Sequence, residues 1–317
     1  MNNSTTSFDV TSGNKTTGLI SGVGNTTVSA GATLTASAIQ QNTLTVNGKV
    51  AIVPQSGTRD DAATVSVVSG LNLAVSNNTW SGLVDLGNND LIVHGGGSSG
   101  LANITNQIKQ GYNSGTWTGT GGITSSTAAA AAQTGNDVMG LGVELNDNGA
   151  GTPLMTTFDG QTVADGDVLV KYTYFGDANL DGTVNGSDYT LIDNGYNSQG
   201  SAHPLSGWRN GDFNYDGVIN GDDYILIDNA FNTIGAGSLA PLDTATLPQE
   251  MIASDTEQLA TPTIAVAAVP EPGSLYLLSL ASIGILGRRR RKNCNANRKT
   301  STACPIRTSP KSEMLNR

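Results

Sequence analysis

Two stretches of twelve residues constrain the fold of this chain more than any other feature of its sequence. They read DANLDGTVNGSD, from Asp177 to Asp188, and DFNYDGVINGDD, from Asp212 to Asp223, and they start 35 residues apart. Each has an oxygen-bearing side chain at positions 1, 3, 5, 9 and 12 and a glycine at position 6. Only 13% of the residues in the chain are charged, so this density of carboxylates is local. Carboxylates so close together repel one another unless a cation neutralises them.

The spacing fits calcium, a hard cation that takes about six to eight oxygen ligands at about 2.3–2.6 Å. Side chains at positions 1, 3 and 5 converge on the ion, the glycine permits a sharp turn, and position 7 contributes its backbone carbonyl. One such stretch could be an Asx-rich turn, but two matching stretches, each followed by a similar helix, favour the metal. The predicted ligands of two Ca²⁺ ions are Asp177, Asn179, Asp181, Thr183, Asn185 and Asp188 in the first loop, and Asp212, Asn214, Asp216, Val218, Asn220 and Asp223 in the second.

The segments after the two loops, YTLIDNGYN and YILIDNAFN, predict two related helices whose apolar faces pack together. KYTYF, before the first loop, is typical of a strand, so half of an EF-hand is duplicated. Residues 174–234 therefore resemble a type I dockerin domain, which implies calcium binding and a cohesin partner. Dockerins often tether carbohydrate-active enzymes to a scaffold. Cohesin recognition in that family relies on hydroxyl residues at loop positions 10 and 11; this chain has Gly186-Ser187 and Gly221-Asp222 there, so only Ser187 fits.

The C-terminal part has a second strong pattern, an apolar segment at 275–287 that ends at a basic cluster. Thirteen helical residues span about 20 Å, less than the roughly 30 Å of a hydrocarbon core, so the segment is a membrane helix or a buried helix. The order of the motifs resembles the PEP-CTERM sorting signal. That resemblance favours the membrane helix and implies export and processing by an exosortase. The matching residues are Val269, Pro270, Glu271, Pro272, Arg288, Arg289, Arg290 and Arg291.

The N-terminal part alternates apolar and polar residues in short runs such as NTLTVNGKVAI and LNLAV, which are typical of strands. Residues 20–80 weakly resemble the autotransporter-associated β-strand repeat, and a β-sandwich explains the same residues. LANITNQIKQGY predicts one short helix, and the alanines at 128–132 are expected in a loop. We therefore expect a mainly β fold, a Gly/Asn/Thr-rich β-solenoid or β-sandwich, with a small α EF-hand-like dockerin module and a C-terminal transmembrane helix.

These patterns divide the chain into six segments. They are a β-repeat passenger region, expected to be truncated at its N-terminus (1–93); a β-rich region with one short helix (94–173); the dockerin-like module (174–235); a linker (236–268); the sorting signal with its membrane helix (269–292, helix 275–287); and a basic cytoplasmic tail (293–317). No signal peptide is recognisable at the start of the sequence, although export requires one.

Charge and the scarcity of catalytic residues narrow the function. The 30 residues from Arg288 onward contain ten of the 16 basic side chains and one of the 26 acidic ones. The residues before Arg288 therefore contain six basic and 25 acidic side chains, which is a net charge of −19. Such an acidic body argues against nucleic acid as a partner. His94 and His203 are expected to be surface residues, and Asp85, Asp90 and Glu144 have no evident acid–base partner.

The expected function is that of a noncatalytic protein of the cell surface or the exopolysaccharide. By the positive-inside tendency the basic cluster stays in the cytoplasm, so residues 1–270 face outward while the C-terminal helix anchors the precursor in the inner membrane. The expected partners are an exosortase-type processing enzyme and a cohesin or an extracellular polysaccharide. The alternative is a dockerin-bearing component of a polysaccharide-degrading assembly.

Overall fold

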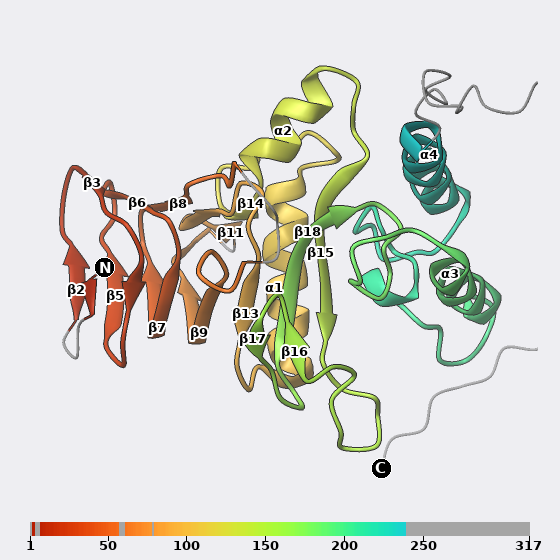
Figure 1. The fold of residues 1–317 in the computed structure, drawn as a ribbon, viewed down its shortest axis with the longest axis horizontal. Helices are drawn as coiled ribbons and strands as arrows, with labels where there is room; N and C mark the ends of the chain where they lie inside the picture. Colours follow the sequence, from red (N-terminus) through yellow and green to blue (C-terminus); the bar gives the residue numbers. More distant parts are fainter. Residues whose placement is uncertain (1, 4–6, 57–60, 78, 239–317) are drawn as a thin grey trace, which may run out of the picture. The chain divides into compact units, whose positions relative to one another are not determined.

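The computed structural model describes residues 2–3, 7–56, 61–77 and 79–238 of the 317-residue chain (Figure 1). These residues lie in one compact unit, Met1–Leu247. The sorting motif, the helix expected at 275–287 and the basic tail lie outside the described residues. Within the described part of the chain, no helix is both long and apolar enough to cross a membrane.

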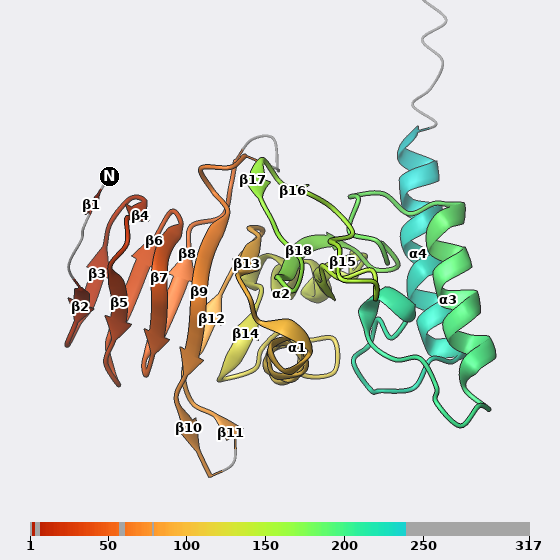
Figure 2. The same ribbon diagram turned by 90° about the horizontal axis from the view of Figure 1, so that it is seen from below.

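Most strands of the N-terminal part belong to one of two large sheets. For much of the chain, successive strands belong alternately to one sheet and to the other (Figures 1 and 2). The nine-stranded sheet has the order β1 (Asn2–Asn3), β4 (Ile20–Ser21), β7 (Ile39–Val46), β9 (Ser66–Leu73), β13 (Leu91–Val93), β18 (Val168–Tyr174) and β15 (Met139–Leu145), with β5 (Asn25–Val28) beside β7 and β2 (Phe8–Val10) beside β5. The five-stranded sheet has the order β14 (Gly122–Thr124), β12 (Leu83–Asp85), β8 (Lys49–Ile52), β6 (Thr33–Ala36) and β3 (Asn14–Thr16).

Two small hairpins accompany these sheets. They are β10 (Val75–Ser76) with β11 (Thr79–Trp80), and β16 (Thr157–Phe158) with β17 (Gln161–Thr162).

Most neighbouring strands in both large sheets run parallel, and their registers align buried residues. Val28 of β5 pairs with Val46 of β7, which pairs in turn with Leu73 of β9, and all three are buried. Alternate side chains of a strand point to opposite faces, so β5, β6 and β8 contribute every second residue to the core, whereas β13, β14 and nearly all of β18 are buried at successive positions. Only β18 runs antiparallel to its neighbours, β13 and β15. The buried apolar residues of both sheets belong to one hydrophobic core.

Two helices are inserted between strands of different sheets. Helix α1 (Gly97–Tyr112) connects β13 to β14 and buries Ile104 and Ile108. At Gly111 the helix comes so close to β14 that a Cβ atom would lie 1.9 Å from the carbonyl oxygen of Ile123, so only glycine fits there. Helix α2 (Ser126–Gln133) follows β14, and the side chain of Ser125 caps it by accepting a hydrogen bond from the backbone N–H of Ala128.

The expected mainly β fold class, whether solenoid or sandwich, is wrong. Large parallel sheets interleaved with helices make the N-terminal part an α/β domain, and a small helical region follows it. Helix α1 has 16 residues, more than the short helix expected, and the alanines at 128–132 lie in α2 instead of a loop. Alternation of apolar residues marks a strand but does not identify its neighbour, so the pattern could not reveal parallel pairing through crossovers.

The region after β18, which we call the calcium-loop module (174–235), contains the helices expected from the sequence. Helix α3 (Gly186–Ser198) follows the first loop and α4 (Gly221–Ser238) the second, with a short 3₁₀ turn, η1 (Trp208–Asn210), between them. The predicted strand before the first loop is β18. Helix α4 continues through Ser238, so the linker expected from residue 236 begins within a helix.

Candidate metal centre

The first loop is closed by the carboxylate at its twelfth position. Oδ1 of Asp188 accepts hydrogen bonds from the backbone N–H groups of Ala178, at 2.9 Å, and Asn179, at 3.4 Å. Its Oδ2 accepts from the N–H of Asn185 at 2.9 Å, as part of a capping box that starts α3. One carboxylate therefore joins both ends of the loop to the first turn of the helix.

The carboxylate at position 1 organises the middle of the same loop. Oδ1 of Asp177 accepts from the N–H of Asp181 at 3.0 Å, and Oδ2 accepts from the N–H of Gly182 at 2.9 Å. The hydroxyl of Thr173, in β18, also donates to Oδ2. Gly182 has a φ of +88°, the conformation that a glycine at position 6 was expected to supply.

The second loop repeats the contacts of the position-12 carboxylate 35 residues later. Oδ1 of Asp223 accepts from the N–H groups of Phe213, at 2.8 Å, and Asn214, at 3.3 Å, and Oδ2 accepts from the N–H of Asn220 at 3.0 Å. Gly217, at position 6, has a φ of +95°. The two loops therefore agree in backbone conformation as well as in residue type.

The carboxylates at both ends of each loop are buried, and the only basic residue that acts on them within the described part of the chain is Lys109, whose charge opposes the raised pKa of Asp212. The exposed fraction is 0% for Asp177, Asp188 and Asp223 and 4% for Asp212. Burial raises the pKa of Asp177 to about 7 and that of Asp212 to about 6, and it also raises the pKa values of the two carboxylates at position 12. Among the described residues, no ion pair involves any of the four. Burying such groups is costly unless a cation compensates them.

The chemistry of these loops fits calcium, although no formed cage is present. Oδ1 of Asp212 is buried and has no hydrogen-bond partner among the described residues, so it is a free acceptor beside other oxygen-bearing side chains. Carboxylate, amide and carbonyl oxygens are the ligands that Ca²⁺ prefers. In the described part of the chain, no group of three or more His, Cys, Asp or Glu side chains is arranged to hold a metal ion. The individual ligand assignments therefore stay predictions.

The two helices of the module support each other in a symmetric way and lie side by side (Figure 2). The hydroxyl of Tyr189 in α3 donates to Asp228 in α4, and the hydroxyl of Tyr224 in α4 donates to Asp193 in α3. The apolar contacts also run from each helix to the other half of the module. Ile227 of α4 packs on Gly176, before the first loop, and Ile192 of α3 packs on Gly211, before the second.

Residues that the sequence did not mark as functional join the module to the α/β domain. Nε1 of Trp208 donates to the backbone carbonyl of Asp177, within the module, at 2.7 Å, while the Trp208 ring covers Gly142 of β15 in the α/β domain. Tyr215, at position 4 of the second loop, donates from its hydroxyl to the carbonyl of Leu141. Both rings are buried, and their centroids lie 5.7 Å apart. Nothing in the spacing of aromatic residues could identify these contacts, because they depend on which strand lies beside the module.

Two titratable residues that seemed isolated in the sequence have partners in the fold. Glu144 of β15 accepts a hydrogen bond from Arg209 of η1 at 2.6 Å and is 1% exposed. His94 lies 2.8 Å from Asp167, measured from Nδ1 to Oδ2. Each pair connects residues far apart in the sequence, so the separation concealed it.

Comparisons with known proteins identify two segments of the chain. Residues 175–232 match the model of the dockerin type I domain, and residues 268–292 match the PEP-CTERM protein-sorting motif. No curated protein and no solved structure matches the chain. Neither family match covers residues 20–80, so the resemblance of that part to an autotransporter-associated repeat is not supported.

These matches agree with the two resemblances seen at the C-terminal half of the sequence. Type I dockerin domains typically bind calcium, and the match implies a cohesin as partner. The sorting motif implies processing by an exosortase and sorting to the cell surface. Together they indicate an exported, sorted protein with a cohesin-binding module.

Proposed function

We propose that this chain is a noncatalytic protein of the cell surface or the exopolysaccharide, sorted by an exosortase and stabilised by two calcium ions. The observation that carries the proposal is the pair of loops that bury the same uncompensated carboxylates at the same positions, 35 residues apart. Calcium bound there would supply the positive charge that the loops lack. The first ion would be held by residues at positions 1, 3, 5, 7, 9 and 12 from Asp177 to Asp188, and the second by the same positions from Asp212 to Asp223.

The noncatalytic part of the proposal is supported by how the described acids are used. The carboxylates at position 12 of both loops and at position 1 of the first loop bind backbone N–H groups of those loops. Glu144 and Asp167 pair with a basic side chain and a histidine of the same chain. General acid–base catalysis needs a carboxyl or imidazole within reach of a substrate. These groups are instead engaged in internal structure.

A second candidate function is that of a component of a polysaccharide-degrading assembly, attached through a cohesin. The match of residues 175–232 to a dockerin domain favours it. The helices also carry exposed aromatic residues, since Tyr196 is 51% and Phe231 46% exposed. Ser187 and Asp222, at the cohesin-recognition position 11 of each loop, are exposed at the first turns of α3 and α4.

Calorimetry on the full-length protein tests the calcium sites. About two Ca²⁺ should bind per chain, and EGTA should lower the melting temperature, because a cation that binds only the folded loops stabilises them. If no calcium bound, or if EGTA left the melting curve unchanged, the proposed calcium sites would be contradicted.

Capture by immobilised cohesin domains separates the two candidate functions. Calcium-dependent retention on a cohesin would favour the assembly component. Retention on no cohesin, by protein that calorimetry shows to be loaded with calcium, would favour the surface protein. Protein in EGTA is the control, because a specific contact with the module should require ordered loops.

A further inference from the structure

Three buried, titratable side chains from three separate elements of the α/β domain meet beside β18. Asp90 immediately precedes β13, Asp159 lies in the turn between β16 and β17, and Lys171 belongs to β18. Asp90 is 3% exposed, and the side chains of Lys171 and Asp159 are 7% and 6% exposed. Two carboxylates and one ammonium would leave one negative charge buried without compensation, which is costly. The cluster is therefore expected to hold a proton in addition to the ion pair.

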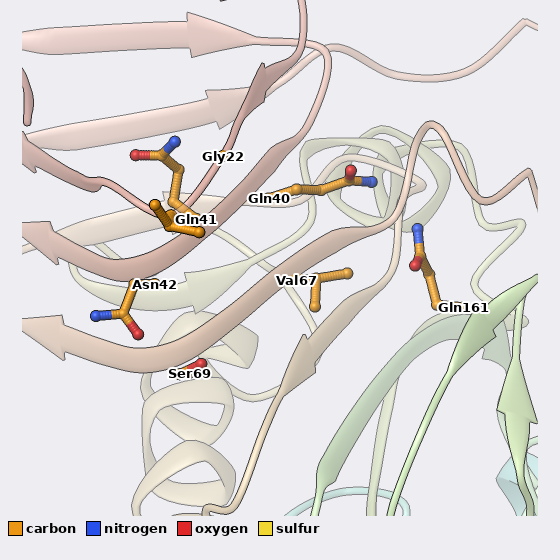
Figure 3. Close-up of a pocket in the computed structure, with 8 residues that line it drawn as sticks. Gly22, Gln40, Gln41, Asn42, Val67, Ser69 and Gln161 are labelled. Atoms are coloured by element: carbon orange, nitrogen blue, oxygen red, sulfur yellow. The ribbon is translucent and has the colours of Figure 1, made fainter. Parts of the chain in front are cut away.

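The turn that carries Asp159 presents its carboxyl group to Lys171. Asp159 and the glycine after it have φ values of +47° and +78°, as in the two-residue type I′ turn that closes a hairpin. Beyond the turn, Nε2 of Gln161 donates to the carbonyl oxygen of Ala62 at 2.6 Å, and Gln40 of β7 donates to the same oxygen (Figure 3). The hairpin is thereby held in place, and Nζ of Lys171 donates to Oδ1 of Asp159.

The surroundings of this contact favour uncharged groups. Nζ of Lys171 lies 5.1 Å from the centroid of the Phe158 ring, and Phe158 is 3% exposed. Removal from water disfavours the charged forms of both an ammonium and a carboxylate. Transfer of one proton from Lys171 to Asp159 gives a neutral amine, which is a nucleophile, in contact with a carboxylic acid.

Asp90 is placed to move protons at this contact. Strands β13 and β18 run antiparallel, and their register sets Asp90 beside Lys171. Oδ1 of Asp90 accepts from the backbone N–H of Tyr172 at 2.7 Å, and its carboxyl group is hydrogen-bonded to that of Asp159. Burial and, after it, the charge of Asp159 raise the pKa of Asp90 well above its ordinary value. Asp90 therefore favours its protonated form and can act as an acid toward Asp159.

We propose that Lys171 and Asp159 become joined by an intramolecular isopeptide bond, with Asp90 as the proton carrier. Nζ of Lys171 attacks Cγ of Asp159, a C–N bond forms, and one C–O bond of the carboxyl group breaks. Asp90 donates a proton to the departing oxygen and accepts one from the nitrogen, so it ends in the state in which it began. An amine and a carboxylic acid thus give an amide and one water, without an oxidant or reductant. The fold holds the two groups in contact, which replaces an encounter in solution.

The bond would tie the β16–β17 hairpin to β18 across 12 positions of the chain. A covalent link of this kind restricts the unfolded chain, as a disulfide does. The α/β domain contains no cysteine, so a disulfide within it cannot serve this purpose. The proposal concerns this domain alone and depends neither on calcium nor on a cohesin.

Mass spectrometry of the denatured full-length protein, produced without an exosortase, tests this inference. Wild type should be lighter than its sequence by the mass of one water, whereas Lys171→Met and Asp159→Ala should each have the mass of their own sequence. A succinimide at Asp159, which precedes a glycine, would also lose one water, so the change must be mapped. A protease that cleaves before aspartate separates residues 159–164 from residues 167–176. The isopeptide bond keeps these two fragments joined, whereas a succinimide does not.

Two comparisons make the test specific. Asp90→Asn should leave most of the two fragments separate, whereas Asp165→Asn, which changes an exposed carboxylate nearby, should leave them joined. Lys49 and Asp85 lie 3.9 Å apart, but the lysine side chain is 44% exposed, so this pair should stay unlinked.

The decisive result comes from wild type and does not require any variant to fold. Separate fragments 159–164 and 167–176 in the wild-type digest would overturn the proposal, whatever the intact mass. Fragments joined as completely in Asp90→Asn as in wild type would overturn the role of Asp90.

Discussion

Replacing Glu144 with glutamine is expected to change how the stability of the protein depends on pH. Glu144 is 1% exposed at the contact between β15 and the calcium-loop module. Burial raises its pKa from 4.5 to about 7, although the guanidinium of Arg209 acts in the opposite direction. The folded protein therefore holds a proton on this carboxyl more tightly than the unfolded chain does.

The sign and size of the effect follow from proton linkage. A carboxyl with a raised pKa in the folded state contributes stability at low pH, and that contribution is lost as pH rises from the unfolded pKa of 4.5 to the folded value of about 7. One pKa unit corresponds to about 1.4 kcal/mol. Between pH 5 and pH 8, titration of Glu144 alone should therefore lower the free energy of unfolding by roughly 2–3 kcal/mol.

Urea denaturation at several pH values between 5 and 8, in saturating calcium, measures this effect. Glutamine does not titrate, so Glu144→Gln should lose less stability than wild type by that amount over the same range. If the glutamine amide itself changes the free energy of unfolding equally at every pH, that change does not affect the difference between the two pH values. Arg209→Gln should steepen the fall, because it removes the charge that opposes the raised pKa. Asp165→Asn controls for the loss of one exposed carboxylate.

Parallel pH curves for wild type and Glu144→Gln would refute the reasoning. They would mean that the ion pair with Arg209 compensates the buried charge fully. In that case Glu144→Gln should also be less stable than wild type at pH 8, whereas the raised pKa predicts that an uncharged residue is tolerated there.

Three further perturbations have defined outcomes. Asp181→Ala and Asp216→Ala should each remove about one of the two calcium ions, measured by calorimetry, because alanine supplies no oxygen at position 5. Gly142→Val should lower the urea midpoint by a destabilisation of about 1–3 kcal/mol, since a Cβ atom there would lie 2.7 Å from the ring of Trp208. In an exosortase-bearing host, with a signal peptide supplied, mass spectrometry of the released protein should find a C-terminus near residues 270–272.

Each of these tests has its own control. Asp222→Ala changes a carboxylate at position 11, which is not a predicted ligand, and should leave two ions bound; loss of an ion there would contradict the ligand assignment. Gly18→Val introduces the same side chain where nothing lies within 4 Å, and an equal drop in both valine variants would count against the close contact at Gly142. If the released protein retained residues 275–317, the prediction of processing would be wrong and the C-terminal segment would act only as a membrane anchor.

The residues of the calcium-loop module could be predicted from the sequence because its contacts are local. The carboxylate at position 12 binds the start of its own loop, so the spacing from Asp177 to Asp188 contains the geometry. The contacts that start the two helices at Asn185 and Asn220 are also local, because each residue bonds to the carboxylate three positions later. A second copy of the pattern made the interpretation more specific than one loop alone.

The α/β domain could not be predicted in the same way, because its contacts are distant. The alternation in β7 marks a strand but does not say that β9 lies beside it in parallel, with Gln40 opposite Val67. Helix α2 is alanine-rich, and alanine alone sets no amphipathic period. The pairing of Glu144 with Arg209 joins residues 65 positions apart, and Gln161 of β17 donates to the carbonyl of Ala62, 99 positions away.

The contact between Trp208 and β15 limits how far the module can be transferred to other proteins. Its ring is buried because Gly142 has no side chain, and Tyr215 needs the carbonyl of Leu141 as an acceptor. Grafted onto an unrelated chain, the module would expose two large aromatic rings and leave Arg209 without Glu144. The module therefore depends on its neighbour in the fold, and recombination between genes would have to transfer β15 together with the two calcium loops.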